Sequence, residues 1–159
     1  MRTFIPGKDE RAVFDTIEEA FQDHWGHTPR NFDEWLARLQ RPNFDPTLWF
    51  LARDGGQLTG VSTCWQRPTS GWVGTLAVRR PWRRHGLGLA LLYQSFGEFF
   101  RRGVTSVGLG VDAQSLTGAT RLYERAGMHP TMRIATFVRE LRPGVDLSVQ
   151  ELTQTEGQQ

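Results

Sequence analysis

The residues with the clearest chemical pattern lie at positions 79–88, RRPWRRHGLG. Four arginines and a histidine precede two glycines, between an apolar run typical of a strand and a segment with helical periodicity. A glycine-rich turn at the start of a helix directs several backbone N–H groups toward one point at the positive end of the helix dipole. Arginine adds charge-assisted hydrogen bonds to phosphate oxygens. The segment therefore predicts an anion-binding turn, with phosphate as its ligand.

Two well-known nucleotide motifs fit this turn poorly. A dinucleotide fingerprint would need a third glycine where Leu91 stands, and a P-loop would need Gly-Lys-Ser/Thr, although the turn contains no lysine. A nucleic-acid module built on RRPWRR would need a wider basic face. Six acidic residues in the first 23 positions argue against such a face, and they are residues 9, 10, 15, 18, 19 and 23. We expect no nucleic-acid partner.

Hydrophobic periodicity predicts the elements that must position this turn. The expected strands cover residues 3–5, 48–54, 57–66, 72–78, 105–112 and 132–141, and the expected helices cover residues 9–25, 32–40, 89–102 and 117–127. This order predicts an α+β fold of three layers, in which about four helices flank a mostly antiparallel, twisted sheet of about six to seven strands. We expect one domain over residues 1–141 and a polar, flexible tail over residues 142–159.

Composition limits the class of protein. A chain of 159 residues with a formal net charge of +2 suits one soluble domain. Cys64 is the only cysteine, which excludes an intramolecular disulfide and favours a reducing compartment. The N-terminus lacks the apolar core of a signal peptide, and no apolar stretch approaches membrane-spanning length. We expect a cytoplasmic protein without a membrane partner.

Two motifs resemble those of the GNAT superfamily of N-acetyltransferases. The segment VRRPWRRHGLGLALL resembles its pyrophosphate loop, Gln/Arg-x-x-Gly-x-Gly/Ala, and VDAQSLTGATRLYERAGM resembles its next motif. The matching residues are Arg83, Gly86 and Gly88 in the first motif and Leu122, Tyr123, Gly127 and Met128 in the second. The order of elements agrees from residue 3 to about residue 141. The sequence around both motifs is most similar to the C-terminal halves of tandem, two-domain members of the mycothiol synthase type.

This resemblance implies transfer of an acetyl group from acetyl-CoA, without a metal, to a primary amine of a small molecule or peptide by direct attack in a ternary complex. By the same resemblance, the strand residues Leu76, Ala77 and Val78 pair with the pantetheine arm, and the N–H of Val78 faces the thioester oxygen. Tyr123 contacts the coenzyme and acts as general acid toward its sulfur. The expected pyrophosphate loop consists of Arg83, Arg84, His85, Gly86, Leu87, Gly88 and Leu89.

Other parts of the expected site stay open. Ser115 stands where many relatives carry an asparagine, and it is expected to contact the coenzyme. The general base is unassigned, because the strand before the loop carries no carboxylate; Asp112, His24, His27 and a water relay are the alternatives. Cys64 is interpreted as a small core residue.

One alternative comes from a different functional class. The chain could be a non-catalytic, regulatory domain that binds acyl-CoA, because Ser115 and the missing carboxylate both depart from the enzyme pattern. A homodimer is compatible with the sequence, which contains no feature that tests it.

Overall fold

The structure is a computed structural model that describes residues 1–22, 27–111, 119–135, 137, 139 and 141–142. Its strands are β1 (Arg2–Thr3), β2 (Trp49–Asp54), β3 (Gln57–Gln66), β4 (Gly71–Val78) and β5 (Val107–Leu109). Its α-helices are α1 (Glu10–Phe21), α2 (Phe32–Ala37), α3 (Leu87–Arg101) and α4 (Ala119–Arg125). Short 3₁₀ helices cover Arg38–Gln40, Pro46–Leu48 and Arg80–Trp82.

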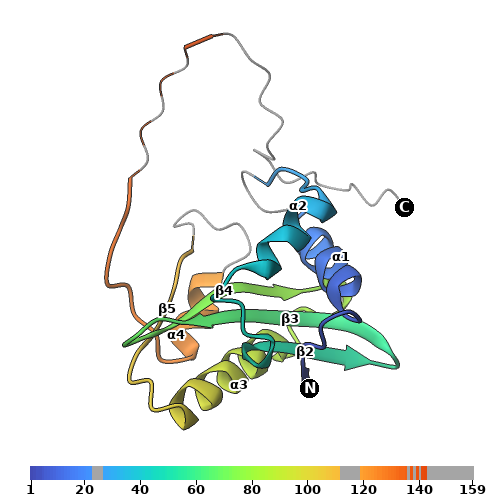
Figure 1. The fold of residues 1–159 in the computed structure, drawn as a ribbon. Helices are drawn as coiled ribbons and strands as arrows, with labels where there is room; N and C mark the ends of the chain where they lie inside the picture. The colour runs from blue at the N-terminus through green and yellow to red at the C-terminus, as the bar shows by residue number, and fades with distance from the viewer. Residues whose placement is uncertain (23–26, 112–118, 136, 138, 140, 143–159) are drawn as a thin grey trace, which may run out of the picture.

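The strands form one sheet in the order β1-β2-β3-β4-β5. Every neighbouring pair is antiparallel except β4 and β5, which run parallel. Helices α1 and α2 cover one face of the sheet, and α3 lies on the opposite face (Figure 1). The predicted three-layer α+β fold with a mostly antiparallel sheet and four α-helices is therefore confirmed for the described residues.

Each face of the sheet has its own hydrophobic core, because the strand side chains alternate between the two helix layers. On the α1 face, the core contains Phe4, Val13, Phe14, Ile17, Trp35, Leu51, Val61 and Ala77. On the α3 face, the main cluster contains Leu48, Cys64, Val73, Leu92 and Phe99. Cys64 is a buried free thiol whose pKa is raised by burial, so its prediction as a core residue is confirmed.

The described part of the chain contains five strands, fewer than the six to seven predicted. The strand expected over residues 132–141 is absent from the described residues of that segment, and the chain after α4 leaves the layers (Figure 1). Met132, Ile134, Phe137 and Leu141 are 75–95% exposed. Alternation predicts a strand's faces but not its neighbour, and a strand forms only where a second backbone edge takes its hydrogen bonds. The expected tail from residue 143 onward lies outside the described residues.

An extra residue interrupts the pairing of β4. Thr75 lies opposite Thr63 and Val73 lies opposite Cys64, so Gly74 has no partner on β3 and forms a β-bulge. A Cβ atom at this position would lie 2.0 Å from Cζ3 of Trp65. Glycine is required here because the indole ring occupies the space of a side chain.

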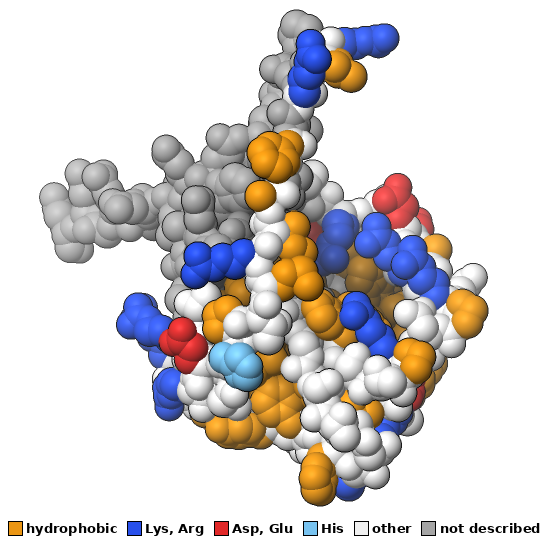
Figure 2. Space-filling model, turned by 90° about the vertical axis from the view of Figure 1, so that its left-hand side faces the viewer, with side chains coloured by type: hydrophobic (Ala, Val, Ile, Leu, Met, Phe, Trp, Pro, Cys, Tyr) orange, Lys and Arg blue, Asp and Glu red, His pale blue; other side chains and the backbone are white. Residues whose placement is uncertain are grey.

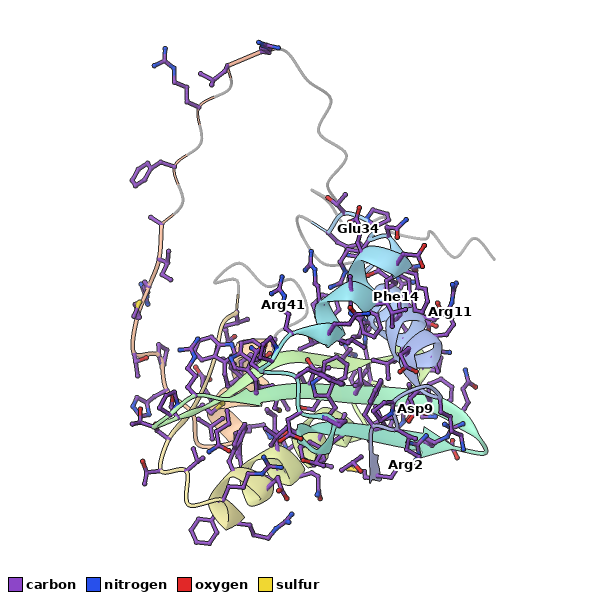
Figure 3. All side chains as sticks on the ribbon, viewed as in Figure 1. Arg2, Asp9, Arg11, Phe14, Glu34 and Arg41 are labelled. Carbon is purple, nitrogen blue, oxygen red and sulfur yellow. The ribbon has the colours of Figure 1, made fainter. Side chains whose placement is uncertain are left out.

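A buried ion pair joins the N-terminus to α1, at the end of the helix where Figure 3 labels Arg2 and Asp9. The guanidinium of Arg2 donates to both carboxylate oxygens of Asp9, at 2.5 and 2.6 Å, and the N–H of Ile5 donates to the same carboxylate at 2.8 Å. The Asp9 side chain is 3% exposed. Its pKa is lowered, chiefly by the hydrogen bonds from Arg2.

We predict that Asp9→Asn lowers the free energy of unfolding at pH 7 by about 1–3 kcal/mol, because it leaves a partly buried guanidinium without its carboxylate. The folded-state pKa of Asp9 lies below its unfolded value, so the carboxylate stabilises the fold above the unfolded pKa. That contribution is lost as the pH falls through the folded pKa. Urea unfolding of the wild type and of Asp9→Asn at pH 7 and in acid checks this. The difference between their free energies of unfolding should be smaller in acid than at pH 7.

Asp15→Asn is the matched control. Asp15 pairs with Arg11 on the same helix, but the two side chains are 45% and 68% exposed. The pair should contribute less than about 1 kcal/mol. Equal losses for both variants would contradict the role assigned to Asp9.

Candidate active site

Among the described residues, no strand pairs with the second half of the β4 edge that faces away from β3. β5 pairs with β4 only from Gly71 to Val73. On the other edge, the N–H of Arg79 donates to the carbonyl of Thr59 at 2.9 Å, so the opposed residues Gly60 and Val78 form a non-hydrogen-bonded pair. The N–H of Val78 consequently points away from β3.

Alternation along the strand extends this pattern. Leu76, two residues before Val78, also directs its N–H to the open edge, whereas Ala77 faces β3 with its backbone and is 1% exposed. Of the three residues predicted to pair with the pantetheine arm, Leu76 and Val78 are thus oriented for the contact and Ala77 is not. Two backbone donors on one free strand edge suit an extended ligand with amide groups.

The first turn of α3 supplies further backbone donors. The N–H of Ala90 donates to the carbonyl of Gly86 at 3.0 Å. The N–H groups of Leu87, Gly88 and Leu89 come before this bond and have no carbonyl one turn earlier to accept them. They lie at the positive end of a 15-residue helix, where an anion is stabilised.

The two glycines of the turn serve different purposes. Gly86 has a φ of +82° with open space around its Cα, so its backbone conformation requires glycine. A Cβ atom at Gly88 would lie 3.2 Å from Cδ2 of Leu122. Gly88 therefore lets α4 approach the start of α3. Arg84 also has a positive φ, +66°, which is rare for a residue other than glycine and concentrates backbone strain in this turn.

Tyr123 follows Leu122 on α4 and is held in the same region. It is half-buried and packs against the cluster that contains Val73, Leu76 and Leu92. Burial raises the pKa of its hydroxyl, because it disfavours the phenolate. Tyr123 therefore keeps its proton at neutral pH, in the form that a general acid requires.

Two arginines of the turn bind α1. Arg83 donates from Nε to the carbonyl of Val78 at 3.0 Å and from Nη2 to the carbonyl of Ala20 at 2.8 Å. Arg79 donates to Oγ1 of Thr16 at 3.2 Å and lies 3.3 Å from the carboxylate of Glu19. The pKa of Arg83 is lowered, first by burial, which fits a side chain inserted between two elements. These side chains fasten the turn to the helix.

The remaining predicted loop residues lie at the surface of the turn. His85 and Gly86 line a cavity of about 440 Å³ with Trp82, whose indole N–H donates to Asp54 at 3.1 Å and holds the turn against the β2–β3 hairpin. Contact of Arg83, Arg84 and His85 with a phosphate stays a prediction. The face drawn in Figure 2 carries Lys and Arg side chains beside exposed hydrophobic ones.

A second cavity lies on the α1 side of β4 and has a volume of about 280 Å³. The residues that line it are Ile17, Phe21, His27, Thr28, Arg30, Gly74 and Thr75. It includes the bulge of β4, directly before the residues whose N–H groups face the open edge. Trp65 and Trp72 lie 6.2 Å apart near the bulge but line neither cavity.

The structure places the β4 edge, the α3 turn and Tyr123 in one region, and their predicted roles toward the coenzyme stay predictions. Asp112, Ser115 and His24 lie outside the described residues, so their predicted roles stay predictions. Three side chains of α1 that contact His27 and Arg79 were not identified from the sequence. Glu18 lies beside His27, and Thr16 and Glu19 contact Arg79. Their only sequence signal is a polar position on an amphipathic helix, which does not reveal a distant partner. Among the described residues, no group of three His, Cys, Asp or Glu side chains could hold a metal ion, and no helix is long and apolar enough to cross a membrane.

Substitutions at Gly86 test whether conformation, rather than space, requires glycine in the turn. We predict that Gly86→Val destabilises the fold by about 1–3 kcal/mol, because a β-branched residue is strained at positive φ. Gly86→Asn should cost less than about 1 kcal/mol, since asparagine tolerates this conformation and caps helices well. Denaturant unfolding compares the two, and equal losses would contradict this explanation.

Comparisons with known proteins agree with this geometry. The family model described as "Acetyltransferase (GNAT) family" matches residues 11–128. The mycothiol acetyltransferase of Thermobispora bispora is 35% identical over 136 residues, which cover 80% of this chain and 45% of that protein. The mycothiol acetyltransferase of Thermomonospora curvata is 35% identical over 128 residues, which cover 80% of this chain and 43% of that protein.

A solved structure is similar as well. The GCN5-related N-acetyltransferase from Sphaerobacter thermophilus has a TM-score of 0.71 and 49% sequence identity, and the match covers 80% of this chain and 40% of that one. The chain therefore spans less than half of the length of these relatives. The match of the family model over most of the sequence shows that the chain belongs to the GNAT family of acetyltransferases.

Proposed function

We propose that this chain is a catalytic GNAT domain that transfers the acetyl group of acetyl-CoA to a primary amine of a small molecule or peptide. The observation that carries the proposal is the position of the open β4 edge. Leu76 packs against the same cluster as the half-buried Tyr123, and Leu76 and Val78 pack against the same cluster as Leu87 in the first turn of α3. Acetyl-CoA contains an extended amide chain, a diphosphate and a thioester, all of which accept hydrogen bonds. A protein that binds all three needs hydrogen-bond donors close together.

Each group of donors would bind a different part of the coenzyme. The N–H groups of Leu87, Gly88 and Leu89 hold the diphosphate at the start of α3. The pantetheine arm adds to the free edge of β4 as a short strand, with main-chain hydrogen bonds to Leu76. The N–H of Val78 is then free to donate to the thioester oxygen.

The reaction follows from this placement. The amine nitrogen attacks the thioester carbon, and the N–H of Val78 stabilises the charge that develops on the oxygen. The C–S bond then breaks, and Tyr123 gives its proton to the departing thiolate. Both substrates are held in one ternary complex, because no side chain in this scheme carries the acetyl group.

Acetyl-CoA binding and amine transfer form the direct test. We expect saturating acetyl-CoA to raise the melting temperature, because a ligand of the folded state stabilises it by mass action. Release of CoA in the presence of a panel of amines should then identify the acceptor. The first amine in the panel is one related to mycothiol, because the relatives are named mycothiol acetyltransferases. Aminoglycosides and N-terminal peptides follow.

The outcomes separate the two functional classes. Binding without transfer to any amine would favour the non-catalytic, acyl-CoA-binding alternative, and absence of binding would exclude both. A thiol reagent can report CoA release, since the protein's single thiol is buried and its pKa is raised. A blank without amine corrects for reaction of the reagent with Cys64.

We predict that Tyr123→Phe lowers kcat by about 100-fold or more, because the thiolate loses its proton donor. The dissociation constant of acetyl-CoA should stay within a factor of about two, since the phenyl ring keeps its packing. Tyr93→Phe is the matched control, because Tyr93 is the only other tyrosine and is 52% exposed on α3. Equal kcat values for Tyr123→Phe and Tyr93→Phe would remove Tyr123 from the mechanism.

A further inference from the structure

Among the described residues that line the cavity beside the β4 bulge, one side chain can accept a proton. Its walls are apolar at Ile17 and Phe21, and β4 contributes only Gly74 and the hydroxyl of Thr75. Arg30 keeps its charge and has no acceptor atom. His27 is the lining residue whose neutral ring presents a lone pair.

A carboxylate lies beside this imidazole. Nε2 of His27 lies 3.4 Å from Oε2 of Glu18, and the two side chains are 10% and 16% exposed. Glu18 is itself fixed from a second side, because Arg30 donates to it from Nε at 2.7 Å and from its backbone N–H at 3.2 Å. A neutral imidazole that carries its proton on Nε2, the nitrogen nearer the carboxylate, presents Nδ1 as the acceptor. A base that is oriented by a third group is the usual arrangement of an activating pair.

The cavity is also close to the reaction. Thr75 lines it, and Val78 stands three residues further along the same strand. Three residues of extended chain span roughly 10 Å. The amine of a substrate that enters the cavity therefore has to reach roughly 10 Å along β4 to the position proposed for the thioester.

We propose that His27 is the general base that takes the proton of the acceptor amine, and that Glu18 is the positioning residue that orients it. This inference rests on the proposed transferase function. As the nitrogen attacks, the N–C bond forms and one N–H proton passes to Nδ1 of His27. The C–S bond breaks, and the thiolate takes the proton of Tyr123. The imidazolium and the phenolate return to their starting forms by exchange with solvent, so protons balance.

In the part of the chain that the structure describes, the charged side chains near His27 come from two segments. Glu18 belongs to the last turn of α1, and Arg30 lies directly before α2. The β4 residues on the far wall carry no charge. Glu18 lies beside the imidazole, and Arg30 pairs with the same carboxylate.

The test uses the full chain, acetyl-CoA and the best amine from the panel. We expect His27→Gln to lower kcat by about 100-fold or more. The acid limb in the pH profile of kcat should disappear with it, while acetyl-CoA affinity and melting temperature stay unchanged. Glu18→Gln should lower kcat by a smaller factor with little change in KM for acetyl-CoA, and Glu18→Asp should recover part of the loss. The matched controls are His129→Gln and Glu34→Gln. Both residues are exposed, and the two variants should behave like wild type.

A second variant covers the case in which His27→Gln does not fold. Added imidazole should restore turnover to His27→Ala, whereas a purely structural role would leave it unresponsive. Unchanged kcat and pH profile in His27→Gln, with wild-type transfer intact, would overturn the base assignment and leave the transferase proposal standing. If the wild type acetylates no amine, both fall together.

Discussion

The unequal pairing of the two edges of β4 is the constraint on which the rest of the structure depends. β3 pairs with the strand along its whole length, whereas β5 pairs with it only at the start. Gly74 forms the bulge at the point where the pairing with β5 ends, and Trp65 fills the space that a side chain would need. Beyond it, the backbone donors of Leu76 and Val78 face an edge on which the described residues form no strand. Backbone donors require a hydrogen-bond partner, so this edge is suited to an extended ligand.

The last turn of α1 links this edge to the cavity on the other side of β4. Three consecutive residues of the helix each hold a different part of the site. Glu18 contacts His27 and Arg30, Glu19 pairs with Arg79, and the carbonyl of Ala20 accepts from Arg83. The turn that precedes α3 and the loop that precedes α2 are therefore positioned by the same helix. Displacement of that helix would move both parts together.

This arrangement changes the interpretation of the arginine-rich turn. The sequence suggested that its arginines attract and clamp phosphate, but Arg79 and Arg83 donate to α1 and to the end of β4. The proposed contacts with an anion are therefore assigned mainly to the backbone N–H groups at the start of α3. An arginine side chain long enough to reach phosphate is also long enough to reach a carbonyl, and sequence spacing does not distinguish the two.

The sequence by itself determined what depends on local patterns. The helices, the strands β2 and β3 and the turn after β4 follow from periodicity, glycine placement and residue type, and the structure contains all of them. Only the tertiary structure decided which strand edges meet and which polar side chains pair. It left residues 132–135 outside the sheet, exposed Leu76 and Val78 at an open edge, and joined Glu18 to His27. The physical reason is that edge pairing and ion pairing are contacts between distant segments. Their geometry is set by how the layers pack, and no local pattern encodes it.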